Sequence, residues 1–197
     1  LINWLPLHSI IYGSALFFGG KPVWTAHLLN SICAGLMVFL GARFASKIVR
    51  TRASEILAAL MIASSPLFVW FGFSMLSEPL FNVLLLSLAL SALKWFRTGK
   101  REWLLLSVFW VILMSIDRYN GWPIALLLGA LIVFRERTGF GFVLALLCIA
   151  FPCLWMAFIY LETGTVLSDF TLHSLDSRQF YGGHPPTGAV IAQSLRL

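Results

Sequence analysis

The sequence predicts an all-α polytopic membrane protein with about six transmembrane helices, a short interfacial helix and an outer loop. Two observations predict this class. Of the 197 residues, 59% are hydrophobic and only 11% are charged, whereas soluble domains carry about 25% charged residues. The apolar residues also form runs of the length that crosses a bilayer, and short clusters of Lys and Arg separate these runs.

Residues 1–22 are expected to form a juxtamembrane segment on the outer face. The apolar run from Leu5 to Phe18 is shorter than the roughly 20 residues that a span needs. We therefore expect a helix that lies at the membrane surface, with Tyr12 near the headgroups. If this run did cross the bilayer, His8 would move to the cytoplasmic side.

Residues 23–161 are expected to form the transmembrane bundle. Ser64-Ser65-Pro66 predicts a kink in its second helix. Pro79 suits the first turn of the third helix, where Glu78 would face the positive end of the helix dipole. The expected spans are about 23–44, 55–75, 78–96, 103–116, 121–134 and 140–160.

The basic loops orient this bundle. The loops at 43–52, 94–101 and 135–137 hold four, four and two of the 14 Lys and Arg residues. Six spans place all three loops on one face, which the positive-inside rule makes cytoplasmic. Residues 162–197 are more polar and are expected to form an extracytoplasmic loop. The polar residues that then converge on the outer face are His8, Lys21, Glu78, Asp117, Arg118, Asp169, Asp176, Arg178 and His184.

The stretch Ser115–Trp122 sets an acid and a base between two apolar runs. Charges in or near a bilayer are costly, so Asp117 and Arg118 are candidates for a functional site. The alternatives are that Arg118 pairs with Asp117 or extends to lipid headgroups. Tyr119 is an aromatic residue of a type common at membrane interfaces, and a sugar contact is its alternative role.

Several classes of site are not indicated. The sequence has no recognition helix for nucleic acid, no Walker loop and no GxGxxG that follows a strand. The three cysteines lie inside apolar runs and are expected to be small buried residues. Asp169, His173 and Asp176 are loosely spaced, which favours a solvated loop over a metal site.

Short motifs follow one another along the chain: Trp4–His8, Ser65–Leu67, Ser77–Phe81 and Asp117–Trp122. In order and spacing they resemble the polytopic GT-C glycosyltransferases. They are similar in particular to the branch related to the dolichyl-phosphate-mannose protein mannosyltransferases and the bacterial lipid A aminoarabinose transferases. Each motif is short and degenerate, and the ordered set from about Trp4 to Pro186 carries the resemblance.

The resemblance implies an inverting hexosyl or pentosyl transferase. Its donor would be a sugar on a polyprenyl phosphate, and its acceptor a protein, lipid or glycan at the outer face. In that family the catalytic base follows the first membrane helix, and residues 1–22 contain no Asp or Glu. We therefore expect a base upstream of Leu1 and a chain that is inactive by itself.

The family's cationic position, which holds the leaving phosphate, corresponds to Arg118. An acidic family position corresponds to Glu78. The residues from which we expect substrate contacts are Arg118, Glu78, His8, Asp117, Tyr119, Arg178 and His184. No cofactor is identified, since Arg can hold a phosphate without a metal, and a divalent metal bound by upstream Asp or Glu stays open.

The main alternative function is a transporter or flippase for lipid-linked or other anionic substrates, with Arg118 and Glu78 as its binding site. Transporters usually place polar groups at the bilayer midplane, whereas the charges here lie at the ends of the spans, which favours the enzyme. A non-catalytic membrane scaffold is the third hypothesis.

A bacterial plasma membrane is the expected location, with the endoplasmic reticulum membrane as the alternative, and membrane lipid is an expected partner.

Overall fold

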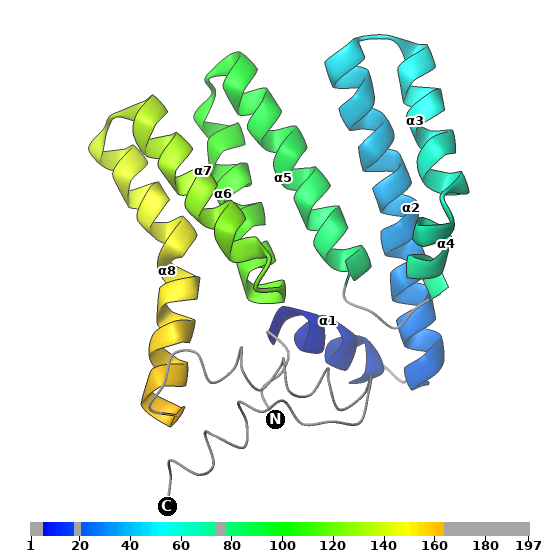
Figure 1. Ribbon diagram of the computed structural model, residues 1–197, viewed down its shortest axis with the longest axis horizontal. Coiled ribbons are helices and arrows are strands. Elements are labelled where there is room, and N and C mark those ends of the chain that lie inside the picture. The colour runs from blue at the N-terminus through cyan, green and yellow to red at the C-terminus, as the bar shows by residue number, and fades with distance from the viewer. Residues whose placement is uncertain (1–5, 18–20, 74–77, 164–197) are drawn as a thin grey trace, which may run out of the picture. The chain divides into compact units, whose positions relative to one another are not determined.

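The computed structural model describes residues 6–17, 21–73 and 78–163, and within these ranges every regular element is a helix (Figure 1). The all-helical class is therefore confirmed for this part of the chain. The helices are α1 (Pro6–Phe17), α2 (Pro22–Val49), α3 (Arg52–Ser64), α4 (Pro66–Phe73), α5 (Glu78–Thr98), α6 (Arg101–Asp117), α7 (Gly121–Glu136) and α8 (Gly139–Thr163). The polar segment from residue 164 onward lies outside the described residues.

Three helices are long and apolar enough to cross a membrane: α2, α5 and the Gly139–Leu161 part of α8. Large apolar side chains are also exposed along the helices. Leu28 is 63% exposed, Leu60 is 62% exposed and Phe134 is 74% exposed. Because water does not favour such surfaces, these features indicate association with a membrane.

The chain divides into two compact units at the middle of α8. The first contains α1 to α7 and the part of α8 up to Phe151, and the second contains α8 from Pro152 onward. The described residues that form the candidate site lie within the first unit.

The expected kink at Ser64–Pro66 is a complete break between α3 and α4. Ser65 is extended, with φ −69° and ψ 121°. The ring of a proline disfavours the helical conformation of the residue before it, which explains an extended residue before Pro66. The Ser65 N–H still donates to the carbonyl oxygen of Ile62, so the break leaves that donor satisfied.

A tight connection sets α5 and α6 side by side. Gly99 and Lys100 join the two helices, and Gly99 has a positive φ of 65°, which glycine adopts without steric cost. Ser107 of α6 donates a 3.0 Å hydrogen bond to Ser91 of α5 inside the core. Because the connection is short, α5 and α6 run in opposite directions, and the start of α5 meets the end of α6 (Figure 1).

The core of the first unit lies mainly between α5, α6 and α7. Its fully buried members include Trp95, Leu104, Val111, Met114 and Ile132. At the end of the core away from α1, the Trp95 indole donates a 3.1 Å hydrogen bond to Glu136. The core thus fixes the three helices along their length, including the ends at which the candidate site is built.

Candidate functional site

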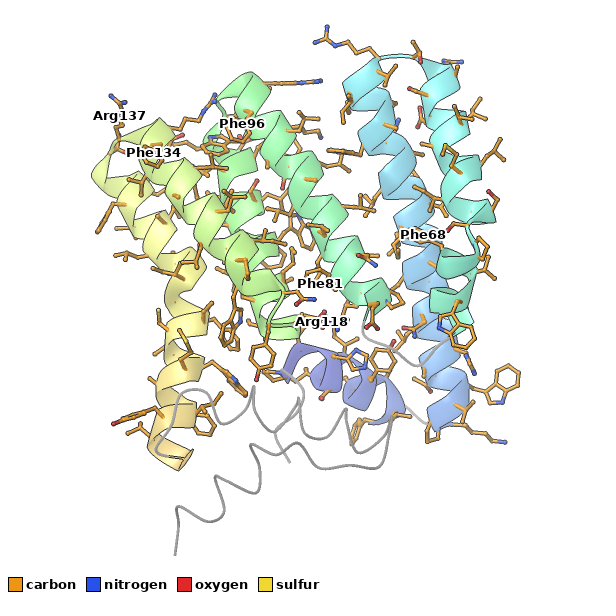
Figure 2. All side chains as sticks on the ribbon, viewed as in Figure 1. Phe68, Phe81, Phe96, Arg118, Phe134 and Arg137 are labelled. Atoms are coloured by element: carbon orange, nitrogen blue, oxygen red, sulfur yellow. The ribbon has the colours of Figure 1, made fainter. Side chains whose placement is uncertain are left out.

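The candidate site lies where α1 meets the start of α5 and the end of α6. Glu78 is the first residue of α5 and Asp117 the last of α6, and Arg118 follows directly. His8 of α1 interacts electrostatically with both Glu78 and Arg118. Figure 2 shows Arg118 beside α1, at the end of the helices opposite Arg137.

Arg118 and Glu78 form an ion pair. The Arg118 Nη1 and Glu78 Oε1 atoms are 2.7 Å apart, and each side chain is 29% exposed. One alternative to a functional role was that Arg118 pairs with Asp117. In the structure Arg118 pairs with Glu78 instead. A guanidinium carries five N–H donors, so one carboxylate does not saturate it. Arg118 can therefore hold a second anion.

The end of α6 decides which way Asp117 and Arg118 face. Asp117 is still helical, whereas Arg118 is extended, with φ −149° and ψ 149°. The Arg118 N–H donates to the Met114 carbonyl, and the Gly121 N–H donates to the Arg118 carbonyl. A helix that stops between two adjacent residues sends their side chains in different directions. Asp117 thus enters the protein interior while Arg118 reaches Glu78.

Gly121 allows the turn to close against α6. A Cβ atom at this position would lie 2.5 Å from the Met114 carbonyl oxygen and 2.9 Å from the Ser115 nitrogen. Both are backbone atoms, which cannot move aside without disturbing the helix. Trp122, the next residue, is buried, and its indole donates a 3.1 Å hydrogen bond to the Ser115 carbonyl. The turn therefore packs closely against the end of α6 at Gly121 and is hydrogen-bonded to it through Trp122.

Asp117 is buried, with 3% of its surface exposed. Neither of its carboxyl oxygens has a hydrogen-bond partner among the described residues. Burial raises the pKa of Asp117 to about 7; Arg118 opposes this rise and Glu78 adds to it. Asp117 is therefore partly protonated near neutral pH, and a carboxyl this deeply buried contacts substrate only if the site opens.

α1 contributes two aromatic side chains from one face. His8 and Tyr12 are one helical turn apart, which places them on the same side, and their ring centroids are 4.1 Å apart. Burial lowers the pKa of His8 below 6.5, with Glu78 opposing the effect and Arg118 adding to it. A neutral imidazole results at pH 7, with one nitrogen that donates and one that accepts.

Tyr12 fastens α1 to α2. Its hydroxyl donates a hydrogen bond to the side-chain oxygen of the buried Asn30. Burial raises the pKa of Tyr12 to about 12, with smaller effects of Cys33 and Asp117, so the hydroxyl stays protonated. The sequence interpretation assigned Tyr12 only to the headgroup region. Its spacing of four residues from His8 was the pattern that could have placed it at the site.

The remaining predicted site residues divide between the turn and the tail. Tyr119 is half-buried and packs edge-on against Trp122, with ring centroids 4.8 Å apart. Arg178 and His184 lie outside the described residues, as do Asp169, His173 and Asp176. Among the residues that are described, no group of three His, Cys, Asp or Glu side chains could hold a metal ion.

No protein-family model matches this sequence, and neither the curated proteins nor the solved structures include a significant match. The function of the chain is therefore inferred from its own residues. What these offer is a cation paired with a carboxylate, a neutral imidazole and a buried carboxyl at one end of an apolar helix bundle.

Proposed function

We propose that this chain is part of a membrane glycosyltransferase that moves a sugar from a polyprenyl phosphate to an acceptor at the outer face of a bilayer. The observation that carries the proposal is the convergence of His8, Glu78 and Arg118 from three helices at one end of an apolar bundle. The proposal includes six transmembrane spans and an outer location for this end.

Arg118 is assigned to the phosphate of the polyprenyl donor. When the sugar is transferred, negative charge develops on the leaving phosphate, and a fixed cation stabilises it. The planar guanidinium offers parallel N–H donors that match two phosphate oxygens. The Arg118 side chain is 29% exposed, so a ligand can reach it. The buried remainder of the side chain is shielded from water that would compete with the ligand.

Glu78 is assigned to pairing with Arg118 when no donor phosphate is bound. It neutralises Arg118 while the donor is absent, which avoids an unpaired cation at the end of an apolar bundle. Its second carboxylate oxygen has no hydrogen-bond partner among the described residues. This oxygen can accept a hydrogen bond from a sugar hydroxyl once the phosphate shares Arg118.

His8 and Asp117 complete the assignment. A neutral His8 donates a hydrogen bond to a phosphate or sugar oxygen without adding charge. Asp117 is too buried to reach an acceptor hydroxyl, so we assign it a positioning role behind Arg118. The catalytic base is accordingly placed outside the described residues.

Transport of an anionic lipid is the competing function. A transporter is expected to bind its substrate near the bilayer midplane. Glu78 and Arg118 instead lie at the ends of α5 and α6, a location that favours chemistry at the membrane surface. Formation of a glycosylated product separates the two functions, because a flippase moves its substrate unchanged.

Arg118→Ala in the full-length protein tests the proposal. Transfer from a panel of undecaprenyl-phosphate sugars is measured in membranes. Hydrogen bonds to charged groups contribute about 1.5–3 kcal/mol, so we expect transfer to fall at least tenfold. Arg118→Lys keeps the charge without the planar fork and should retain part of the activity. Arg137 is exposed and lies at the opposite end of the helices, so Arg137→Ala is the control. Equal transfer by the unaltered protein and the three variants would refute the assignment.

A further inference from the structure

A second polar site lies at the other end of the first unit, where α2 ends, α3 begins and α5 ends. A cavity of about 440 Å³ opens there, and its wall includes Lys47, Arg50, Arg52, Arg97 and Glu55. α5 has 21 residues and carries Glu78 at its start and Arg97 in its last turn. At about 1.5 Å per residue, the cavity and the Arg118 site are roughly 30 Å apart.

Charge is unbalanced around this cavity. Four cationic side chains face one carboxylate, that of Glu55. That carboxylate is already engaged, since its Oε1 atom lies 3.5 Å from Nη1 of Arg43, which is not part of the wall. In the part of the chain that the structure describes, none of the four wall cations makes an ion pair. Like charges around one cavity repel one another, and an anion in the cavity would relieve the repulsion.

The backbone brings the cations together. α2 ends at Arg50, whose φ of 60° and ψ of 28° are left-handed. Glycine usually occupies this position because a Cβ atom disfavours the conformation. Here an arginine occupies it and forms part of the cavity wall. Thr51 and Arg52, the N-cap and first residue of α3, belong to the same wall, at a helix end that favours anions.

We propose that this cavity binds a phosphate group, supplied by an anionic phospholipid headgroup or by a free phosphate ion. The three arginines of the wall offer planar donor forks, and Lys47 adds a point charge. Apolar residues next to Lys47, Arg50 and Glu55 in the sequence are exposed: Ile48 by 54%, Val49 by 58% and Ile56 by 62%. These residues would contact the acyl chains of a lipid whose headgroup fills the cavity. This site is separate from the proposed transferase site and does not depend on it.

The test uses the purified 197-residue chain in a neutral detergent. Native mass spectrometry measures binding of phosphatidylglycerol, with zwitterionic phosphatidylcholine for comparison, and titration calorimetry measures binding of inorganic phosphate. Arg50→Gly removes one cation and also relieves the left-handed backbone, so the variant should fold at least as well. Arg97→Gln removes a cation from a different helix. A contribution of about 1 kcal/mol per basic residue near a lipid surface predicts about fivefold weaker binding for each variant.

Arg137→Gly is the matched control. Arg137 is also an exposed arginine at a helix end, with a φ of 46°, and it does not line the cavity. We expect this variant to bind as the unaltered chain does. Binding of phosphatidylglycerol alone would identify a lipid headgroup, and binding of inorganic phosphate would identify a free ion. The proposal is overturned if neither probe binds, or if Arg137→Gly weakens binding as much as Arg50→Gly.

Discussion

Replacing Asp117 with Asn should change how the stability of the protein depends on pH. The carboxyl is buried without a hydrogen-bond partner among the described residues, and its pKa rises from 3.8 to about 7. Each pKa unit corresponds to about 1.4 kcal/mol, so ionising Asp117 costs the folded protein roughly 4 kcal/mol as an upper limit. Asn has the same shape and stays neutral at every pH.

The direction of the effect follows from proton binding. Between about pH 4 and pH 7 the folded protein holds a proton on Asp117 that the unfolded chain has released, so the free energy of unfolding falls as the pH rises. Above about pH 7 the loss is complete. His8 acts in the opposite direction, because its lowered pKa makes the folded protein less stable as the pH falls through 6.5. Comparing Asp117→Asn with the unaltered chain cancels most of the His8 effect.

Reversible unfolding in mixed micelles, followed by circular dichroism from pH 4 to pH 8, measures this difference. We expect the two proteins to have similar unfolding free energies near pH 4 and Asp117→Asn to be the more stable one at pH 8. Glu102→Gln, which removes an exposed acid from the other end of α6, is the control and should leave the pH profile unchanged. Parallel pH profiles for Asp117→Asn and the unaltered chain would refute the account of a strained buried carboxyl.

Two further substitutions test how the site is held together. Gly121→Ala should lower the free energy of unfolding by about 1–3 kcal/mol, because its Cβ atom would meet the Met114 carbonyl oxygen at 2.5 Å. Gly35→Ala, with no atom within 4 Å of its Cβ, should be neutral or stabilising by up to about 1 kcal/mol, and equal effects of the two would contradict the close approach. Tyr12→Phe should cost about 1 kcal/mol by removing the hydrogen bond to Asn30. Tyr160→Phe, at a tyrosine that is 55% exposed, should cost nothing measurable, and an equal loss from both tyrosines would show that Tyr12 does not fasten α1.

The helices were predictable because apolar runs with Pro and Gly at their ends leave few alternatives. Pro6 begins α1, and the pair Ser65–Pro66 interrupts the second expected span. The size of that interruption was not predictable. A proline bends a helix or ends it according to how the following turn packs, which depends on contacts from elsewhere in the chain.

The candidate site was predictable as a group of residues and not as a set of pairs. Charge counting placed Glu78 and Arg118 on one face, and their contact then depends on the antiparallel packing of α5 and α6. Which member of the pair Asp117–Arg118 meets Glu78 depends on the residue at which α6 ends. Sequence patterns leave helix ends uncertain by one or two residues, which is enough to exchange the two roles.

The basic cavity was missed for a different reason. The residues between Arg43 and Arg52 were interpreted only as a loop that orients the bundle. Their convergence needs Arg50 to adopt a left-handed conformation that its residue type disfavours. A glycine at this position would have predicted the turn, whereas an arginine gives no indication of it.

Binding of undecaprenyl phosphate to the 197-residue chain tests most directly whether Arg118 holds a polyprenyl phosphate. This lipid is the leaving group shared by donors that differ in their sugar, so its binding requires neither the sugar nor the catalytic base. Native mass spectrometry should show a bound lipid that Arg118→Ala weakens at least tenfold, while Arg137→Ala leaves that binding unchanged. Equal affinity of Arg118→Ala and the unaltered chain would contradict the claim.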